Sequence, residues 1–345
     1  MILLFGMMML VASLKLARFF ETIAQGIARA VRHPMALLVT VVFASGLLSA
    51  LFVNDTICLV FTPVLIEIAE ARGHRALPYL LALATASNIG SSATITGNPQ
   101  NMLIGSLSHI PFTTFSLALA PIALVGLAID AIVLVVLFRG TLSDKDVSGI
   151  ARAGRPIHRA LLVKSLMVAG AVLAGFLAGF DTALVSAAGA GTLLVTRRVK
   201  PDKLYRQVDW DLLMLFVGLF VIVAGIERVG IDRAFFDWLR PIGITSLAGL
   251  TFVATVLSNV ISNVPAVMLF TRMVPLLPDP SSAWLALAMS STLAGNLTIL
   301  GSVANLIVVE GARRRGIRIS FMDYLKVGLP VTVGTLAFGV WWLAR

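Results

Sequence analysis

Long apolar runs, divided by short polar or basic segments, make up most of the chain. They predict helices at about 1–14, 78–108, 112–138, 160–180, 182–197, 210–226, 283–311 and 321–343. A helix that crosses a bilayer needs about 20 mostly apolar residues. Runs such as 160–180 and 321–343 carry few charges, whereas a soluble helix shows a regular polar face. The pattern therefore predicts an all-α polytopic membrane protein.

Two further apolar stretches, 34–71 and 241–277, carry polar residues at their middle. Each half of such a stretch is marginal for a hydrocarbon core of about 30 Å, because a helix rises only about 1.5 Å per residue. We therefore expect two re-entrant helical hairpins with polar tips. The predicted helices at 78–108 and 283–311 are interrupted by Gly, Asn, Ser and Thr in a similar way.

These polar segments occur twice in the chain. Residues of the first hairpin recur 209 positions later, so that Asn54, Phe61 and Thr62 correspond to Asn263, Phe270 and Thr271. Residues of the first interrupted helix recur 204 positions later, so that Thr94, Gly97 and Asn101 correspond to Thr298, Gly301 and Asn305. Duplicated, interrupted membrane segments with polar centres are typical of secondary transporters. We expect two inverted repeats, 1–138 and 160–345, joined by a cytoplasmic linker at 139–159.

Basic loops set the expected orientation in the membrane. Lys and Arg concentrate in cytoplasmic loops, and here they gather at 72–75, 139–164, 197–206 and 313–318. With these loops inside, the first hairpin enters from the cytoplasm and the second from outside, as an inverted repeat requires. Basic amphipathic stretches before the hairpins, at 15–33 and 227–240, are typical of interfacial helices. The first repeat begins without counterparts of the helices at 160–180 and 182–197, so we expect its leading helices to be missing.

Composition excludes several other classes of protein. The chain is 58% hydrophobic and 13% charged. The single core of a water-soluble protein could not bury that much apolar surface. Its net charge of +10 lies in loops between apolar runs, so topology explains it better than a nucleic-acid partner does. A single cysteine, Cys58, excludes an internal disulfide, and the 4 His lack the spacing of a zinc site. No hydrolase or metalloprotease motif is present, so we do not expect an enzyme or a bound cofactor.

Candidate ligands are small neutral polar residues and the glycines beside them. Asn, Ser and Thr can bind a dehydrated cation or an anion, and unwound backbone adds free carbonyls and amides. The alternative is that Gly and Ser only allow close helix packing. The candidates in the first repeat are Asn54, Asp55, Thr56, Asn88, Gly90, Ser91, Ser92, Thr94, Thr96, Gly97, Asn98 and Asn101. Those in the second repeat are Ser262, Asn263, Gly295, Asn296, Thr298, Gly301 and Asn305.

Asp55 is the charged residue among these candidates. At a hairpin tip near the midplane, an ionised carboxylate is costly unless a cation, a proton or hydrogen-bond donors compensate it. Asp55 is therefore a candidate proton or sodium carrier, with Asn54 and Asn88 as further sodium ligands. The alternative is a cap on the following half-helix. Its counterpart in the second repeat is Val264, so the two sites are not equivalent.

Three other residues are weaker candidates. Asp130 lies within a predicted helix and could serve a proton path or be hydrated or paired structurally. Arg272 could attract an anion or extend its side chain to the outer surface. Cys58 could bind a metalloid or pack as a small buried residue.

Five motifs stand out together, namely Leu4–Val11, Asn54-Asp-Thr56, Asn88-Ile-Gly90, Thr96–Asn101 and Ser262-Asn-Val-Pro265. In this combination they resemble the ion transporter superfamily, which includes arsenite permeases, related sodium/proton antiporters, citrate transporters and divalent-anion symporters. The resemblance implies a homodimer in which a transport domain moves like an elevator against a scaffold. It also implies that Asn54, Asp55 and Thr56 face 88–101, and that Ser262 and Asn263 face 295–305. The symporters' repeated Ser-Asn-Thr tip is absent here, which favours the arsenite-permease-like and citrate-transporter-like branch.

We therefore predict a multi-pass carrier in a bacterial-type inner membrane. It would move a small inorganic or carboxylate anion, or an oxyanion-like solute such as arsenite, by alternating access. Transport would be coupled to protons or driven by the membrane potential, which contributes about 2.3 kcal/mol per charge at 100 mV. A sodium/proton antiporter is the alternative. A channel fits duplicated inverted hairpins less well than a carrier does.

Overall fold

The computed structural model describes residues 1–142, 158–195, 201–230, 238–239, 241 and 243–345. All regular secondary structure in these ranges is helical, which confirms the predicted all-α class. Up to residue 142 the helices are α1 (Ile2–Leu16), α2 (Phe19–Ala30), α3 (Pro34–Leu51), α4 (Asn54–Ala71), α5 (Leu77–Ser91), α6 (Pro99–Ser108) and α7 (Phe112–Phe138). From residue 158 they are α8 (Arg159–Leu177), α9 (Thr182–Val195), α10 (Pro201–Tyr205), α11 (Trp210–Val229), α13 (Leu247–Ile261), α14 (Asn263–Phe270), α15 (Pro280–Leu293), α16 (Val303–Arg313) and α17 (Phe321–Leu343).

The helix breaks fall at the predicted polar segments. Extended residues at 52–53 separate α3 from α4, and Ser262, with a φ of +78°, separates α13 from α14. Asn98 accepts a hydrogen bond from the backbone of Asn101 and so caps α6, with Pro99 at its first position. Short 3-10 turns at Ala294–Asn296 and Ile299–Gly301 fill the gap between α15 and α16.

Four helices are long and apolar enough to cross a membrane, namely α3, α7, α8 and α17. A fifth is added if α1 and α2, which meet at a bend of 55°, count as one span. The helix α2 lies within the stretch 15–33, for which the sequence predicts an interfacial helix. The guanidinium of Arg72 holds the end of α2 by donating to the carbonyls of Ala28 and Val31. The predicted linker at 139–159, the interfacial helix at 227–240 and the end of the helix at 182–197 lie largely or partly outside the described residues.

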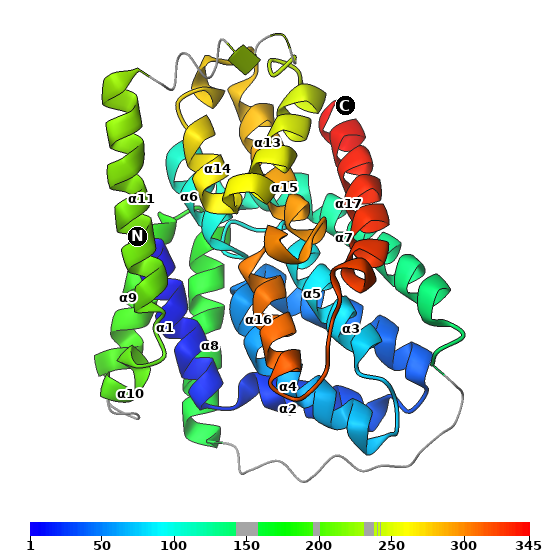
Figure 1. The fold of residues 1–345 in the computed structure, drawn as a ribbon. Helices are drawn as coiled ribbons and strands as arrows, with labels where there is room; N and C mark the ends of the chain where they lie inside the picture. The colour runs from blue at the N-terminus through cyan, green and yellow to red at the C-terminus, as the bar shows by residue number, and fades with distance from the viewer. Residues whose placement is uncertain (143–157, 196–200, 231–237, 240, 242) are drawn as a thin grey trace.

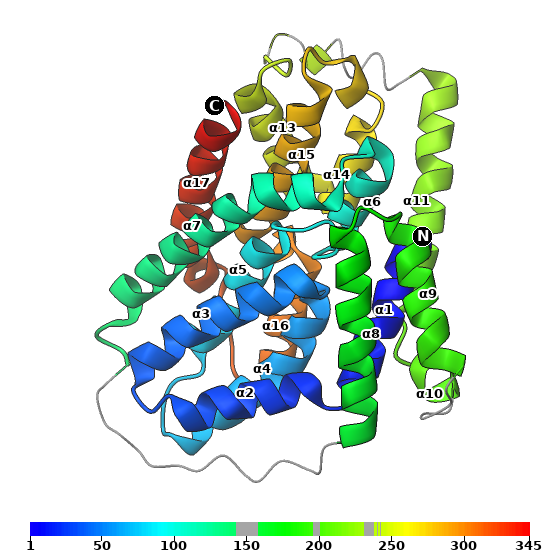
Figure 2. The same cartoon turned by 180° about the vertical axis from the view of Figure 1, so that it is seen from behind.

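The helices α1, α8, α9 and α11 form one flank of the molecule (Figures 1 and 2). The helix α1 packs on α8 and α9. Gly6 of α1 lies so close to Ser186 that an added Cβ would come within 2.7 Å of its backbone. The hydroxyls of Ser13 and Ser165, 2.7 Å apart, join α1 to α8.

The remaining helices pack in a reciprocal pattern around the breaks. The first hairpin, α3–α4, packs on α5, and the second, α13–α14, packs on α15. Beyond each break the chain crosses over, so that α16 packs on α4 and α5 while α6 packs on α14 and α15. The four broken segments thus meet at the centre of the molecule (Figure 1).

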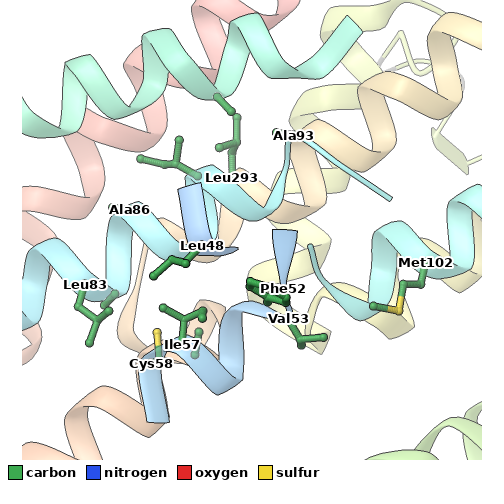
Figure 3. Packing of buried hydrophobic residues seen from close by; sticks show 14 of the residues in the cluster. Leu48, Phe52, Val53, Ile57, Cys58, Leu83, Ala86, Ala93, Met102 and Leu293 are labelled. Atoms are coloured by element: carbon green, nitrogen blue, oxygen red, sulfur yellow. The ribbon is translucent and has the colours of Figure 1, made fainter. Parts of the chain in front are cut away.

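Apolar side chains surround the break of the first hairpin (Figure 3). Leu48, Phe52, Val53 and Ile57 are all less than 8% exposed and pack with residues of α5. This packing buries the extended backbone of the tip within the protein, which is a condition under which irregular backbone persists at membrane depth.

Candidate functional site

Each hairpin tip is hydrogen-bonded to its own interrupted helix. In the first half, the backbone N–H of Asn54 donates to Gly97 O at 3.0 Å, and Thr94 Oγ1 donates to Ala50 O at 2.5 Å. In the second half, Asn259 Nδ2 donates to Ala294 O at 3.0 Å, and Thr298 Oγ1 donates to Asn259 Oδ1 at 3.2 Å. The bond between Thr94 and Ala50 corresponds to the bond between Thr298 and Asn259 by the offsets of 204 and 209.

Asn263 joins the second hairpin to its interrupted helix as well. In the amide orientation that pairs donors with acceptors, its Nδ2 donates to Ser291 O at 3.0 Å and Gly301 O at 3.2 Å. Asn263 therefore lies against the segment that the resemblance implies, whereas Ser262 is exposed.

Two asparagines close the unwound gaps. Asn101 Nδ2 donates to Ser91 O at 3.2 Å and to Thr94 O at 3.0 Å. Asn305 Nδ2 makes the matching bonds to Gly295 O at 2.6 Å and Thr298 O at 3.1 Å. Buried carbonyls freed from a helix need partners, and these amides supply them. Asn101 and Asn305 therefore hold the shape of the unwound segments.

The two interrupted helices also bond to each other. Asn88 Nδ2 donates to Asn296 Oδ1 at 2.9 Å and to Asn305 Oδ1 at 3.0 Å, and Ser302 Oγ donates to Asn88 Oδ1 at 3.0 Å. Thr292 stands 204 residues after Asn88. Its hydroxyl donates to Asn101 Oδ1 at 3.3 Å and accepts from Asn98 Nδ2 at 3.2 Å. The bond between Asn88 and Asn305 is thus matched by the bond between Thr292 and Asn101.

Some of the predicted site residues make close packing contacts or local hydrogen bonds. Gly90 lies against Gly46 of α3, and an added Cβ would overlap the carbonyl of Gly46. Gly97 is confined in the same way by the carbonyl of Ser91. Ser92 donates to Ile89 O at 2.6 Å in its own helix, and Thr96 lies 3.4 Å from Thr94 Oγ1. Gly295 and Gly301 face each other, with 2.9 Å between Gly295 O and a Cβ built on Gly301.

Four buried polar atoms of the hairpins have no hydrogen-bond partner among the described atoms. They are Asn54 Oδ1, Ser49 Oγ, Thr251 Oγ1 and Ser258 Oγ. Ser49 and Ser258 occupy matching positions, 209 residues apart. Unsatisfied buried oxygens are costly, and a bound ligand is one way to satisfy them.

Asp55 lies outside this amide network. Asp55 and Thr56 line a cavity of about 160 Å³ between α4, α1, α16 and the start of α11. The other polar side chains of the cavity belong to Lys15, Gln207 and Asp209. No side-chain oxygen caps α4, which the structure describes throughout, so the capping alternative for Asp55 is not formed. Asp55 therefore faces the α1 flank, while Asn54 faces the central amides.

Two of the three weaker candidates, Cys58 and Asp130, are buried, whereas Arg272 is exposed. Cys58 is fully buried, with its Sγ 3.1 Å from Ser87 Oγ, which fits a packing role. Asp130 is fully buried in α7, and Thr85 Oγ1 donates to its Oδ2 at 3.0 Å. Among the described residues, no three His, Cys, Asp or Glu side chains are placed to share a metal ion.

Comparison with known proteins identifies the family. The family model described as a citrate transporter matches residues 1–288. The chain belongs to the citrate transporter family. An uncharacterized transporter of Mycobacterium tuberculosis is 32% identical, over 99% of this chain and 84% of its own. The silicon efflux transporter LSI3 of Oryza sativa subsp. japonica is 31% identical, over 98% of this chain and 84% of its own.

Two more distant likenesses agree with this assignment. The putative transporter arsB of Dictyostelium discoideum is 26% identical, over 98% of this chain and 81% of its own. The crystal structure of the Alcanivorax borkumensis YdaH transporter has the same fold, with a TM-score of 0.67 at 15% identity, over 99% of this chain and 84% of that one. The predicted resemblance to the ion transporter superfamily is confirmed. This citrate transporter family member is a multi-pass membrane protein and a secondary transporter, not an enzyme.

Several residues of the site in this family member were missed by the sequence reasoning. Thr292 and Ser302 could have been found, because they stand 204 residues after Asn88 and Asn98. Asn259 could have been found from the repeated hairpin motif. Lys15 and Asp209 carry no such signal, since the cavity that they line with Asp55 joins segments far apart in the chain.

Proposed function

We propose that this transporter carries a small anion or oxyanion-like solute, of the arsenite or carboxylate type, coupled to protons or driven by the membrane potential. The main observation that supports this proposal is the pair of matching hydrogen bonds between Asn88 and Asn305 and between Thr292 and Asn101. These bonds join the two interrupted helices, and each hairpin tip is bonded to its own interrupted helix, which supports one centre of neutral amides, hydroxyls and backbone groups. Such a centre binds a solute through dipoles and needs no fixed charge of its own.

The same observation supports two inverted repeats and alternating access. Because the hairpins and interrupted helices share hydrogen bonds across both halves, they form one unit that would move together as an elevator. The α1 flank packs as a separate group and would serve as the scaffold. The proposed orientation keeps the basic loops in the cytoplasm, and a homodimer is proposed from the family resemblance alone.

Asp55 is the proposed coupling residue. It lies at the boundary between the moving unit and the α1 flank, in a cavity that also holds Lys15 and Asp209. A carboxylate at this boundary can bind a proton or a cation in one position of the unit and release it in the other. The cavity therefore supports coupling close to, but apart from, the central amides.

A sodium/proton antiporter is the second candidate. The observation that favours it is that four oxygen-bearing side chains, Asp55, Asp209, Gln207 and Thr56, line the cavity among apolar residues and Lys15. Hard cations prefer oxygen ligands of this kind. The names of the relatives, which include a silicon efflux transporter and an arsB-like transporter, favour an uncharged or anionic solute instead.

Proteoliposomes with a pH-sensitive dye in the lumen distinguish these functions. Sodium, arsenite, citrate and silicic acid are added separately to the wild type, to Asp55→Asn and to the control Asp211→Asn, whose carboxylate is exposed. We expect solute-driven proton flux for arsenite, citrate or silicic acid, lost in Asp55→Asn and kept in the control. A pH change driven by sodium alone would instead establish the antiporter.

A further inference from the structure

A second carboxylate lies within the helical core, apart from the hairpin tips. Asp130 in α7 is fully buried. Its Oδ2 lies 3.0 Å from Thr85 Oγ1, and its Oδ1 has no hydrogen-bond partner among the described atoms. An ionisable group buried inside a membrane protein is costly and marks a functional path by default.

The charged and titratable surroundings of Asp130 are sparse. The helices packed against α7 are α3, α5, α8, α15 and α17. The helix α17 carries Asp323, Tyr324 and Lys326 in its first two turns, and the buried hydroxyl of Tyr324 also lacks a partner among the described atoms. The sequences of α3 and α15 contain no titratable residue, α5 contains only Tyr79, and α8 contains Arg159 and Lys164 within its first two turns. Asp130 forms no ion pair with the charged side chains that the structure describes.

Thr85 allows Asp130 to exist in two protonation states. Its single hydroxyl hydrogen lies within reach of two acceptors, Leu81 O at 2.9 Å and Asp130 Oδ2 at 3.0 Å. When Asp130 is ionised, the Thr85 hydroxyl donates to the carboxylate. When Asp130 carries a proton on Oδ2, that proton is donated to Thr85 Oγ1, and the hydroxyl turns to Leu81 O. Both states keep the same heavy-atom positions.

A chain of hydrogen bonds links Asp130 to the central amides. The backbone carbonyl of Thr85 accepts from Asn296 Nδ2 at 3.2 Å, and Asn296 Oδ1 accepts from Asn88 Nδ2 at 2.9 Å. Asn88 Oδ1 in turn accepts from Asn54 Nδ2 at the first hairpin tip, at 3.1 Å. A short path of polar groups therefore connects Asp130 to the proposed solute site.

We propose that Asp130 is a second proton-binding site of this transporter, linked through Thr85 and Asn296 to the solute site. This inference rests on the proposed function, since it adds a proton to the same transport cycle. In the step, a proton from water adds to the carboxylate of Asp130 to give the carboxylic acid, and it later returns to water. An anion at the centre and a proton on Asp130 favour each other electrostatically, and by linkage each increases the binding of the other.

Infrared difference spectroscopy of the purified full chain in lipid tests the protonation directly and requires no transport. Spectra are recorded from mildly acidic to mildly alkaline pH for the wild type, Asp130→Asn and the exposed-carboxyl control Asp181→Asn. We expect a carboxylic acid C=O band that disappears as the pH rises, is absent from Asp130→Asn and persists in the control. A wild type in which no pH-dependent band is removed by Asp130→Asn would overturn the proposal, because Asp130 would then hold one protonation state throughout.

A second variant protects the test against misfolding. Thr85→Val keeps the shape of the side chain and the backbone carbonyl that accepts from Asn296, but it removes the hydroxyl. We expect the band of Asp130 to shift in frequency in Thr85→Val, which identifies the band even if Asp130→Asn fails to fold. A pH-dependent band that Thr85→Val leaves unmoved would not belong to Asp130 and would contradict the proposal.

Proteoliposome flux then separates this inference from the proposed function. For Asp130→Asn we expect fewer protons per solute and a flatter pH profile than for the wild type, with solute uptake retained. An unchanged proton-to-solute ratio would overturn the role of Asp130 and leave the proposed function intact. If the wild type moved none of the solutes while the band still titrated, the proposed function would fail and the proton site would stand.

Discussion

Asn88 uses all four hydrogen-bonding positions of its amide. Its Oδ1 accepts from Asn54 and Ser302, and its Nδ2 donates to Asn296 and Asn305. An asparagine amide has two donors and one oxygen with two lone pairs, so this residue is saturated. Asn88 is therefore better placed to hold other ligands in position than to bind a solute itself, whereas Asn54 still has a free oxygen.

Removing the Asn88 amide should be costly for this reason. Asn88→Ala leaves four buried groups with one partner fewer, and each unsatisfied buried group costs roughly 1–3 kcal/mol. Since the neighbours can partly rearrange, we expect the free energy of unfolding to fall by about 2–4 kcal/mol. Thr40→Ala serves as the control, because its hydroxyl donates to Ala36 O on an exposed part of α3. Denaturant unfolding in detergent measures both, and equal losses would contradict the bonding described for Asn88.

At the scale of the helix, the sequence predicts most boundaries, because the signals that start and stop helices are local. Pro34, Pro99 and Pro280 stand at the first positions of α3, α6 and α15. Ser320 and Asp323 form a capping box at the start of α17. Local signals could not predict which residues bond to one another at the helix breaks. The bond between Asn88 and Asn305, for example, joins residues 217 positions apart.

The contact between α3 and α5 gives a prediction at this scale. Gly90→Ala would push a methyl group into the backbone of Gly46, and overpacking of this kind costs about 1–3 kcal/mol. Gly191→Ala in α9 is the matched control, because a Cβ there meets no atom within 4 Å. We expect a lower melting temperature and lost transport for Gly90→Ala. An equally stable and active Gly90→Ala would show that Gly90 does not set the helix spacing.

At the scale of the whole molecule, the polar centre and the Asp55 cavity play different parts. The central amides join both halves into one unit, while the cavity lies between that unit and the α1 flank. Periodicity and the repeat predict the first arrangement in outline. The second depends on how α1, α4, α11 and α16 pack, which a linear pattern of residues does not contain.

Alternating access is the central claim, and thiol labelling at the cavity tests it most directly. Thr56→Cys is placed in a Cys58→Ser background, and membrane-impermeant reagents are applied separately to each side of oriented vesicles. His109→Cys and Gly316→Cys, in loops on opposite sides of the proposed topology, control for sidedness. We predict that Thr56→Cys reacts from either side, and that a solute gradient speeds labelling from one side while slowing it from the other. Labelling from one side only, or rates that rise and fall together on both sides as in an open pore, would contradict the account.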